Sequence, residues 1–241
     1  MSFTPVLRAE ALKVRTLRSL SCALPAVFAV VTAFSVPAGG SDTSDPDFDP
    51  LFRALSGVWP GQIAAIAYGA LVVSSEYQGN GIRLSLAAVP QRGRWFAAKL
   101  TVVAVPVLLV GFAAGLAALL TARAVLGTAA AGLTTGEQVR GVVGCGIYLM
   151  LIALFAAGLT TLFRSGVATL STLVPFILVV SFVIGDAAGP AAGFLPDQAG
   201  QIVLHQEHGG TLGPWTGLTV TALWAVAALV AGFWRLRRRD A

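Results

Sequence analysis

The chain has 241 residues, of which 56% are hydrophobic and only 11% are charged, with a net charge of +5. An ordinary globular domain carries about 25% charged residues, so the composition excludes a soluble fold and indicates a helical membrane protein. At this length we expect a single membrane domain over residues 1–241 with no appended soluble domain.

Residues 1–18 are basic and have an amphipathic pattern at helical spacing. Five apolar residues share one side of the helical wheel: Phe3, Val6, Leu7, Val14 and Leu17. Glu10 and Lys13 interrupt this stripe. The pattern predicts a cytoplasmic interfacial helix on an anionic inner leaflet, and a simple basic flank that sets topology is the alternative.

Six charge-free intervals follow, each near the roughly 20 apolar residues that a helix needs to cross a bilayer core. They are Ser19–Gly40, Ala54–Ser75, Leu100–Ala122, Gly141–Phe163, Ser165–Gly185 and about Pro214 to Trp234. The first follows a long basic segment and lacks a convincing cleavage site, so we expect a retained span rather than a signal peptide. Glycines four residues apart favour close helix packing at Gly57 and Gly61, and at Gly111 and Gly115.

Lysine and arginine predict the orientation, because cytoplasmic loops carry the excess of positive charge. With the N-terminus inside, 13 of the 16 cations lie in cytoplasmic segments, and only Arg53, Arg123 and Arg140 lie outside. We therefore expect an all-α membrane protein with six transmembrane helices and both termini in the cytoplasm. Abundant alanine and glycine, with arginine far above lysine, indicate a GC-rich bacterial genome, so the expected location is a bacterial plasma membrane.

Residues 186–213 form an unusual segment on the expected outer side. They are moderately apolar and are interrupted by Gly189, Pro190, Gly193, Pro196 and Gly200. A segment so often interrupted cannot cross as a helix, yet it is too apolar for a free loop. We expect a re-entrant or interfacial segment whose backbone is covered by protein, with a packed surface loop as the alternative.

The long cytoplasmic loop, residues 76–99, reads "EYQGNGIRLSLAAVPQRGRWFAAK". Gly79 and Gly81 let the chain leave the preceding span. Ile82–Val89 is predicted to be a short helix that Pro90 ends, and Gly93 is predicted to turn the chain. Such a short apolar helix needs a surface to pack against, either lipid headgroups or a cytosolic partner.

This loop resembles the first cytoplasmic loop of the ABC-2 family of ABC-transporter permeases: an acid, glycines, a short helix with Arg and Leu, then Pro, Arg and Lys. "LRAEALKVRTLRS" (Leu7–Ser19) resembles the family's N-terminal cytoplasmic segment. "LGPWTGLTVTALWAVAALVAGFWRLRRRDA" resembles its final span and basic C-terminus, especially in actinobacterial members. Six spans with both ends inside form the family's unit, so the resemblance covers the whole chain. Ile82 departs from it, because a Thr is expected after the second glycine.

The resemblance implies that residues 76–99 are a coupling loop that docks in a groove of a separate ABC ATP-binding subunit. Closure of two such subunits on ATP would move the loop and tilt the spans. The implied partner-binding residues are Glu76, Gly79, Gly81, Arg83, Leu84, Leu86, Pro90, Arg92 and Arg94. Three of them, Arg83, Arg92 and Arg94, would meet acidic or carbonyl groups of that subunit. Glu76 would anchor the second span against a basic residue of the N-terminal helix. The alternative is that these charges only set topology.

The same resemblance implies a second six-helix permease, identical or related, with the substrate path between the two protomers. Second and fifth spans line that path in the family, which indicates the mildly polar residues Gln62, Tyr68, Ser171, Thr172 and Ser181. Hydrogen bonds between helices of one chain are the alternative role for these residues. The apolar spans favour export of a hydrophobic or amphipathic substrate, such as a drug, a lipid or a peptide.

Catalytic chemistry is absent from the sequence. There is no P-loop, so we expect no cofactor on this chain and ATP with Mg²⁺ on the partner subunit. No acid lies within a span, which argues against an ion-driven carrier. Cys22 and Cys145 are expected to be buried small hydrophobes, and His205 with His208 lacks further metal ligands. We expect neither an enzyme nor a nucleic-acid partner; a non-transporting sensor or accessory protein is the alternative function.

Overall fold

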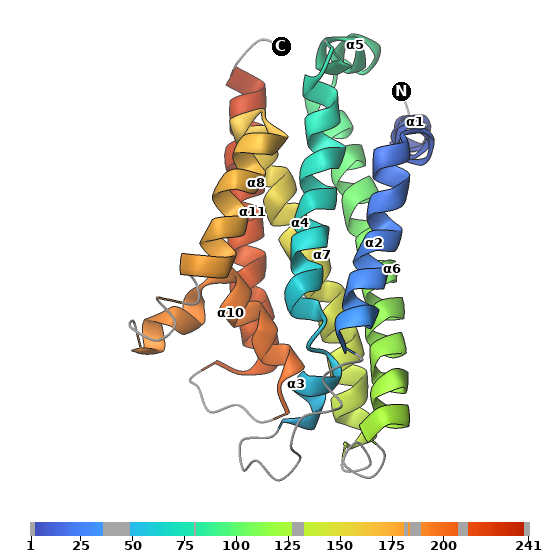
Figure 1. The fold of residues 1–241 in the computed structure, drawn as a ribbon. Helices are drawn as coiled ribbons and strands as arrows, with labels where there is room; N and C mark the ends of the chain where they lie inside the picture. The colour runs from blue at the N-terminus through green and yellow to red at the C-terminus, as the bar shows by residue number, and fades with distance from the viewer. Residues whose placement is uncertain are drawn as a thin grey trace.

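The computed structural model describes residues 3–35, 49–79, 81–126, 133–180, 183, 189–206 and 212–238. Within these residues all regular secondary structure is helical (Figure 1). The longer helices are α1 (Phe3–Thr16), α2 (Arg18–Ser35), α4 (Val58–Ser74), α6 (Arg92–Leu126), α7 (Thr135–Phe163), α8 (Gly166–Pro175) and α11 (Pro214–Arg238). The shorter ones are α3 (Pro50–Ala54), η2 (Ser75–Tyr77), α5 (Gly81–Ala88), η4 (Phe176–Val180), η5 (Gly189–Phe194), α10 (Pro196–Gln201) and η6 (Ile202–Leu204).

Five helical stretches in the described residues are long and apolar enough to cross a membrane. They are Arg18–Ser35, Val58–Tyr77, Arg92–Ala124, Thr135–Phe163 and Pro214–Arg238. They run alongside one another as a bundle (Figure 1), which supports the all-α membrane-protein class. The expected fifth interval contains α8 and the π-helical turn η4, a shorter apolar helix. Residues 181, 182, 184 and 185 of that interval lie outside the described part of the chain.

Helix α7 is the centre of the bundle and packs against α4, α6, α8 and α11. Small residues allow these close approaches. A Cβ built on Gly69 of α4 would collide with the Ala153 carbonyl oxygen of α7, and one built on Gly111 of α6 would lie 2.7 Å from the Gly146 Cα. Similarly, a Cβ on Gly61 would collide with Val31 of α2. The close packing predicted from the glycine spacing is therefore confirmed.

The two ends of the bundle differ in content. Helices α1 and α5 and the last turn of α11 lie at one end, whereas α3 and α10 lie at the other (Figure 1). We call the first the basic end, because α1, the α5 segment and the C-terminal turn of α11 bring together Arg and Lys side chains that are distant in sequence. The segments predicted to be cytoplasmic thus share one end of the molecule.

The described part of the 186–213 segment folds as η5, α10 and η6 at the opposite end (Figure 1). Its residues Ala199, Gly200, Val203 and Leu204 are buried against α7 and α11. The expected re-entrant or interfacial position of this segment, and the alternative of a packed surface loop, both stay predictions. Residues 186–188 and 207–211 lie outside the described residues.

One expectation about the core is wrong. Cys145 is fully buried, but Cys22 is exposed on α2. Helix α2 packs on α4 and α6 with one face only, and Cys22 lies on the other face.

Candidate functional site

The chain leaves α4 through the turn η2 and enters α5 by a tight change of direction. Gly79 has φ +59°, in the left-handed region that glycine adopts without a Cβ penalty. Helix α5 then ends before Pro90, as predicted. The predicted turn at Gly93 is wrong, because α6 already starts at Arg92 and continues through it. Gly93 is the second residue of α6, so it costs less than the roughly 1 kcal/mol of a glycine in a helix interior.

The inner face of α5 packs on its own chain. Ile82 is buried together with Trp95 and Phe96 from the start of α6 and Leu236 from the end of α11. Leu86 packs against the same small core, and so does Val89. Helix α5 is therefore seated on protein and not suspended in solvent. Leu86, expected to contact a partner, faces this core instead.

The outer face of α5 is formed by Arg83, Leu84, Ala87 and Ala88, which are all exposed. Leu84 is three positions from Ala87 and four from Ala88, and Arg83 is four from Ala87, so these residues share one helical face. Leu84 is 71% exposed. An apolar side chain held this far out, at the tip of the molecule, is the kind of feature that marks an interaction surface when it has neighbours to extend it.

Beneath α5 lies a buried ion cluster, which we define as Glu10 and Lys13 from α1, Glu76 from η2, Ser85 from α5 and Lys99 from α6. The Lys99 ammonium is 2.8 Å from Glu76 Oε1 and is also paired with Glu10. The Lys13 ammonium lies 2.9 Å from Glu10 Oε1 and 3.0 Å from Glu76 Oε1. The carboxylates of Glu10 and Glu76 therefore join α1, η2 and α6, which are distant in sequence.

The charges of the ion cluster balance, with two carboxylates against two ammonium groups. The side chains of Lys99, Glu10 and Glu76 are only 2%, 4% and 5% exposed. Charges buried to this degree are tolerated only when paired and hydrogen-bonded. Burial opposes the charged form of Lys13, yet hydrogen bonds to Glu10 and Glu76 raise its pKa above the ordinary value.

Ser85 ties α5 itself into the ion cluster. Its Oγ donates to Glu76 Oε2 at 2.7 Å and accepts from Lys13 Nζ at 2.9 Å. Because Ser85 is in the middle of α5, the helix is anchored through both its apolar inner face and this polar contact. The expected anchor of Glu76 on a basic residue of the N-terminal helix is Lys13, and the cluster encloses Glu76 instead of presenting it at the surface.

Arg92 joins the start of α6 to the end of α11. Its Nη1 donates to the carbonyl oxygens of Leu236 at 2.6 Å and Arg237 at 3.2 Å. The last carbonyls of a helix have no partner within that helix, so a guanidinium there both satisfies them and complements the helix dipole. The expectation that Arg92 meets acidic or carbonyl groups of a partner stays a prediction; within this chain it bonds to the two carbonyl groups of α11. Arg83 and Arg94 are exposed.

The residues proposed for a substrate path do not come together. Gln62 and Tyr68 are fully buried inside the bundle. Tyr68 donates to the Val102 carbonyl at 3.1 Å, and the Tyr148 hydroxyl donates to Gln62 Oε1. Both are helix-to-helix contacts of the kind given above as the alternative role.

The other three path residues belong to the region of α8. Ser171 and Thr172 are exposed on that helix, and each donates to the Ala168 carbonyl. Ser181 lies outside the described residues. Only the α8 pair therefore offers polar atoms at an exposed surface.

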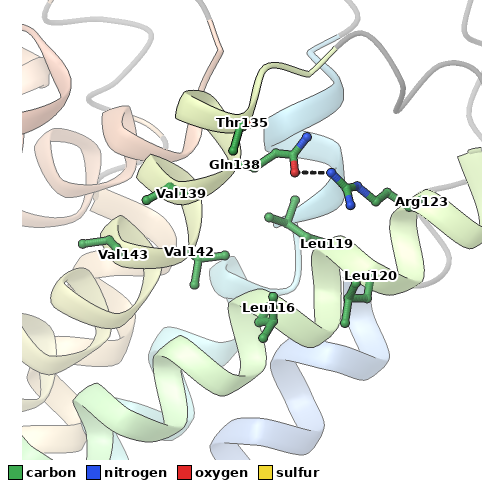
Figure 2. A pocket seen from close by; sticks show the side chains of 9 residues that line it. All are labelled: Leu116, Leu119, Leu120, Arg123, Thr135, Gln138, Val139, Val142 and Val143. Carbon is green, nitrogen blue, oxygen red and sulfur yellow. Dashed lines mark hydrogen bonds between the residues drawn. The ribbon is translucent and has the colours of Figure 1, made fainter.

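Two hollows lie at opposite ends of the bundle. A cavity of about 140 Å³ beside α5 is lined by Val6, Val89, Pro90, Gln91 and Arg94. A cavity of about 230 Å³ lies between α6 and α7 near the other end. Figure 2 shows its apolar walls and, at its rim, the hydrogen bond from Arg123 to Gln138. In the described residues no group of His, Cys, Asp or Glu is arranged to hold a metal ion.

At the end of the bundle opposite α5, polar contacts of Asp49 fix the segment before α11. The sequence did not reveal this role of Asp49. Asp49 accepts from the backbone N–H groups of Phe52 at 2.9 Å and Gln206 at 2.8 Å, and it pairs with His205 at 3.2 Å. The His205 ring stacks on Phe52, with 4.1 Å between centroids. Burial works against the Asp49 charge, but His205 and the two N–H groups lower its pKa below the ordinary value. His205 is thus engaged within the protein, and His208 lies outside the described residues.

Comparison with known protein families and with curated proteins finds no match to this chain.

Proposed function

We propose that this chain is the membrane-spanning permease subunit of an ABC transporter of the ABC-2 type. It would cross a bacterial plasma membrane six times with both termini in the cytoplasm, the α8 region forming the fifth span. ATP and Mg²⁺ would bind a separate ATP-binding subunit, and the exported substrate would be hydrophobic or amphipathic. This proposal extends the resemblance of the loop and terminal segments to that family.

The observation that carries the proposal is the outer face of α5. This helix lies at the basic end, its inner face is covered by its own chain, and its outer face offers Leu84 with Ala87, Ala88 and Arg83. An apolar patch beside a cation suits a groove that is lined by apolar side chains and has acidic or carbonyl groups at its edge. The hollow beside α5, lined in part by Val89 and Arg94, would receive a side chain of the same partner.

The ion cluster supports another part of the proposal, that movement of α5 is transmitted to the membrane spans. A push on α5 reaches η2 through the bond from Ser85 to Glu76 and reaches α6 through Lys99. It reaches α1 through Lys13. Charge-assisted hydrogen bonds are among the strongest noncovalent contacts in proteins, so α5 and the helices joined here would move together. Closure of a partner on ATP would in this way tilt spans that do not touch it.

The partner permease and the substrate path are assigned by the same proposal. The exposed side of α8, with Ser171 and Thr172, would face a second six-helix permease, identical or related. The buried pair Gln62 and Tyr68 would keep the bundle together. A path between two protomers then needs no continuous channel within one chain.

The test compares the wild-type chain with Arg83→Glu plus Leu84→Asp, both on the outer face of α5. Tagged chains are purified from their native membranes, bound proteins are identified by mass spectrometry, and ATP hydrolysis of the eluate is measured. Loss of an interface hot spot typically costs about 2 kcal/mol or more, which weakens binding roughly thirtyfold. We expect the wild type to bring down a P-loop ATPase and the double variant to lose it.

The matched control is Arg53→Glu plus Val139→Asp, which makes the same charge changes at exposed positions of the opposite end. We expect this control to retain the ATPase, because neither position is near α5. Gel filtration verifies that all chains remain folded. Full retention of the ATPase by a folded α5 variant, or no ATPase with the wild type, contradicts the proposal; the second result favours an accessory protein.

A further inference from the structure

A third cavity, of about 450 Å³, lies at the basic end where α1 crosses the bundle. Leu7 and Val14 of α1, Leu24 of α2, and Val105 and Pro106 of α6 form its apolar walls. Its volume falls within the range of roughly 300–1,000 Å³ that is typical of sites for small molecules. Because α1 covers a gap between two candidate spans, the cavity follows α6 inward from the end of the molecule.

The polar rim of this cavity is cationic. Arg15 is the one charged residue among the described residues that line it, and its side chain is exposed. Arg8, on the same helix, is exposed as well. Glu10, the acid of α1, is turned into the ion cluster and paired with Lys99 and Lys13. The burial of this acid leaves the surface of α1 with a positive charge above an apolar cavity.

We infer that this cavity holds one acyl chain of an anionic phospholipid, with the lipid phosphate on Arg15. The inner leaflet of a cell membrane carries anionic lipids, and basic pockets between spans on that side bind their headgroups. A guanidinium forms two parallel hydrogen bonds to a phosphate, and the hydrocarbon wall below it suits a lipid tail. The inference depends on the membrane orientation in the proposed function, but not on the ATP-binding partner.

The bound lipid has a mechanical consequence. Its tail would lie between α1 and α6, the two helices that Glu10 and Lys99 already join. The lipid therefore fills space at the point where movement of α5 reaches the spans. It would set how freely α1 follows α6.

The experiment uses the full chain in a mild detergent and counts bound lipid by native mass spectrometry. Phosphatidylglycerol is the probe, and phosphatidylcholine with the same acyl chains is the zwitterionic comparison. We expect the chain to bind phosphatidylglycerol about fivefold more tightly, and Arg15→Gln to remove this preference. Val105→Trp, which fills the cavity from a half-exposed position, is expected to reduce binding of both lipids.

Two matched controls separate the cavity from its surroundings. Arg18→Gln removes an exposed charge outside the lining, and Leu109→Trp adds the same ring one turn further along α6. Both should bind phosphatidylglycerol like the wild type. If Val105→Trp unfolds, Leu24→Phe fills the same cavity from α2.

Three results would overturn the inference. Equal losses with Arg15→Gln and Arg18→Gln mean diffuse attraction to a basic surface. Full binding by a folded variant with a filled cavity means that no acyl chain enters it. Equal affinity for the two lipids removes the role of charge. A failed search for an ATPase partner leaves all of these measurements unaffected, because they use the purified chain alone.

Discussion

Lys99 carries its charge where only 2% of its side chain is exposed, and it does so because two carboxylates surround it. Glu76 receives three donors in turn, from Lys13, Lys99 and Ser85. Taking such groups out of water is costly, so the net gain from the ion cluster is small compared with the cost of leaving one member unpaired. The cluster therefore enforces an arrangement of helices more than it stabilises the fold.

Removal of Lys99 should show this asymmetry. Lys99→Met leaves two buried carboxylates with Lys13 alone, and we expect a loss of about 3 kcal/mol in the free energy of unfolding. The double change Lys99→Met plus Glu76→Gln restores the balance of charge and should recover part of that loss. Chemical unfolding of the purified chains in detergent measures both. A single variant as stable as the wild type would mean that water already solvates the cluster.

Acid should weaken the contact at the opposite end. The pKa of Asp49 in the folded protein lies below its ordinary value of 3.8. Its contribution to stability is therefore complete above that value and is lost as the pH falls through the lower, folded pKa. We expect the thermal midpoint of the wild type to fall below about pH 4 more steeply than that of Asp49→Asn. Parallel pH profiles would show that the Asp49 charge contributes nothing.

At the scale of elements, local sequence signals were sufficient to predict the bounds of α5 but not the contacts that surround it. Its start and end follow from Gly79 and Pro90, which act through their own backbone. The burial and pairing of Glu10 could not be predicted, because its partner Lys99 belongs to another helix far along the chain. For the same reason the sequence could not show that Leu84 faces outward whereas Leu86 packs inward. Which side of a short helix is covered depends on α6 and α11.

Two helical glycines, Gly69 in the interior of α4 and Gly93 in the first turn of α6, should respond in opposite ways to the same change. Gly69→Ala places a methyl group against the Ala153 carbonyl of α7, so it should separate α4 from α7 and lower the thermal midpoint. Gly93→Ala places its methyl group 3.7 Å from Phe233, an ordinary contact, and should stabilise the protein by about 0.4–1 kcal/mol, because alanine leaves the unfolded chain less conformational freedom. Thermal unfolding in detergent gives both shifts. A neutral Gly69→Ala would show that the two helices are not in close contact.

At the scale of the whole molecule, the sequence predicted two features better than the number of spans: the fold class, and the grouping of the predicted cytoplasmic segments at one end. Charge-free intervals are an average over many residues, so single errors matter little, and five of them correspond to long helices in the structure. The interval at α8 differs because Pro175 is followed by a π-helical turn, which shortens the regular helix. A hydropathy pattern does not record such a break.

Thiol labelling in intact cells tests the orientation. In a Cys22→Ser background, we expect a cysteine at Ser44, in the acidic segment after the first span, to react with an impermeant reagent. A cysteine at Gln91, which is exposed beside α5, should react only after the cells are opened. The reason is the excess of Lys and Arg in the segments that share the basic end. The reverse pattern would place α5 outside the cell and rule out docking to a cytosolic ATPase.

The ion cluster also has a consequence for biosynthesis. Glu10 and Lys13 leave the ribosome early, but Lys99 follows only after the first two expected spans have been made. At roughly 5–20 residues per second, α1 waits on the order of 5–20 s for its partner. During that time its charges remain in water at the membrane surface, where they cost nothing. The arrival of Lys99 then draws α1 onto the bundle, so that the newly inserted helices are joined in the order of their translation.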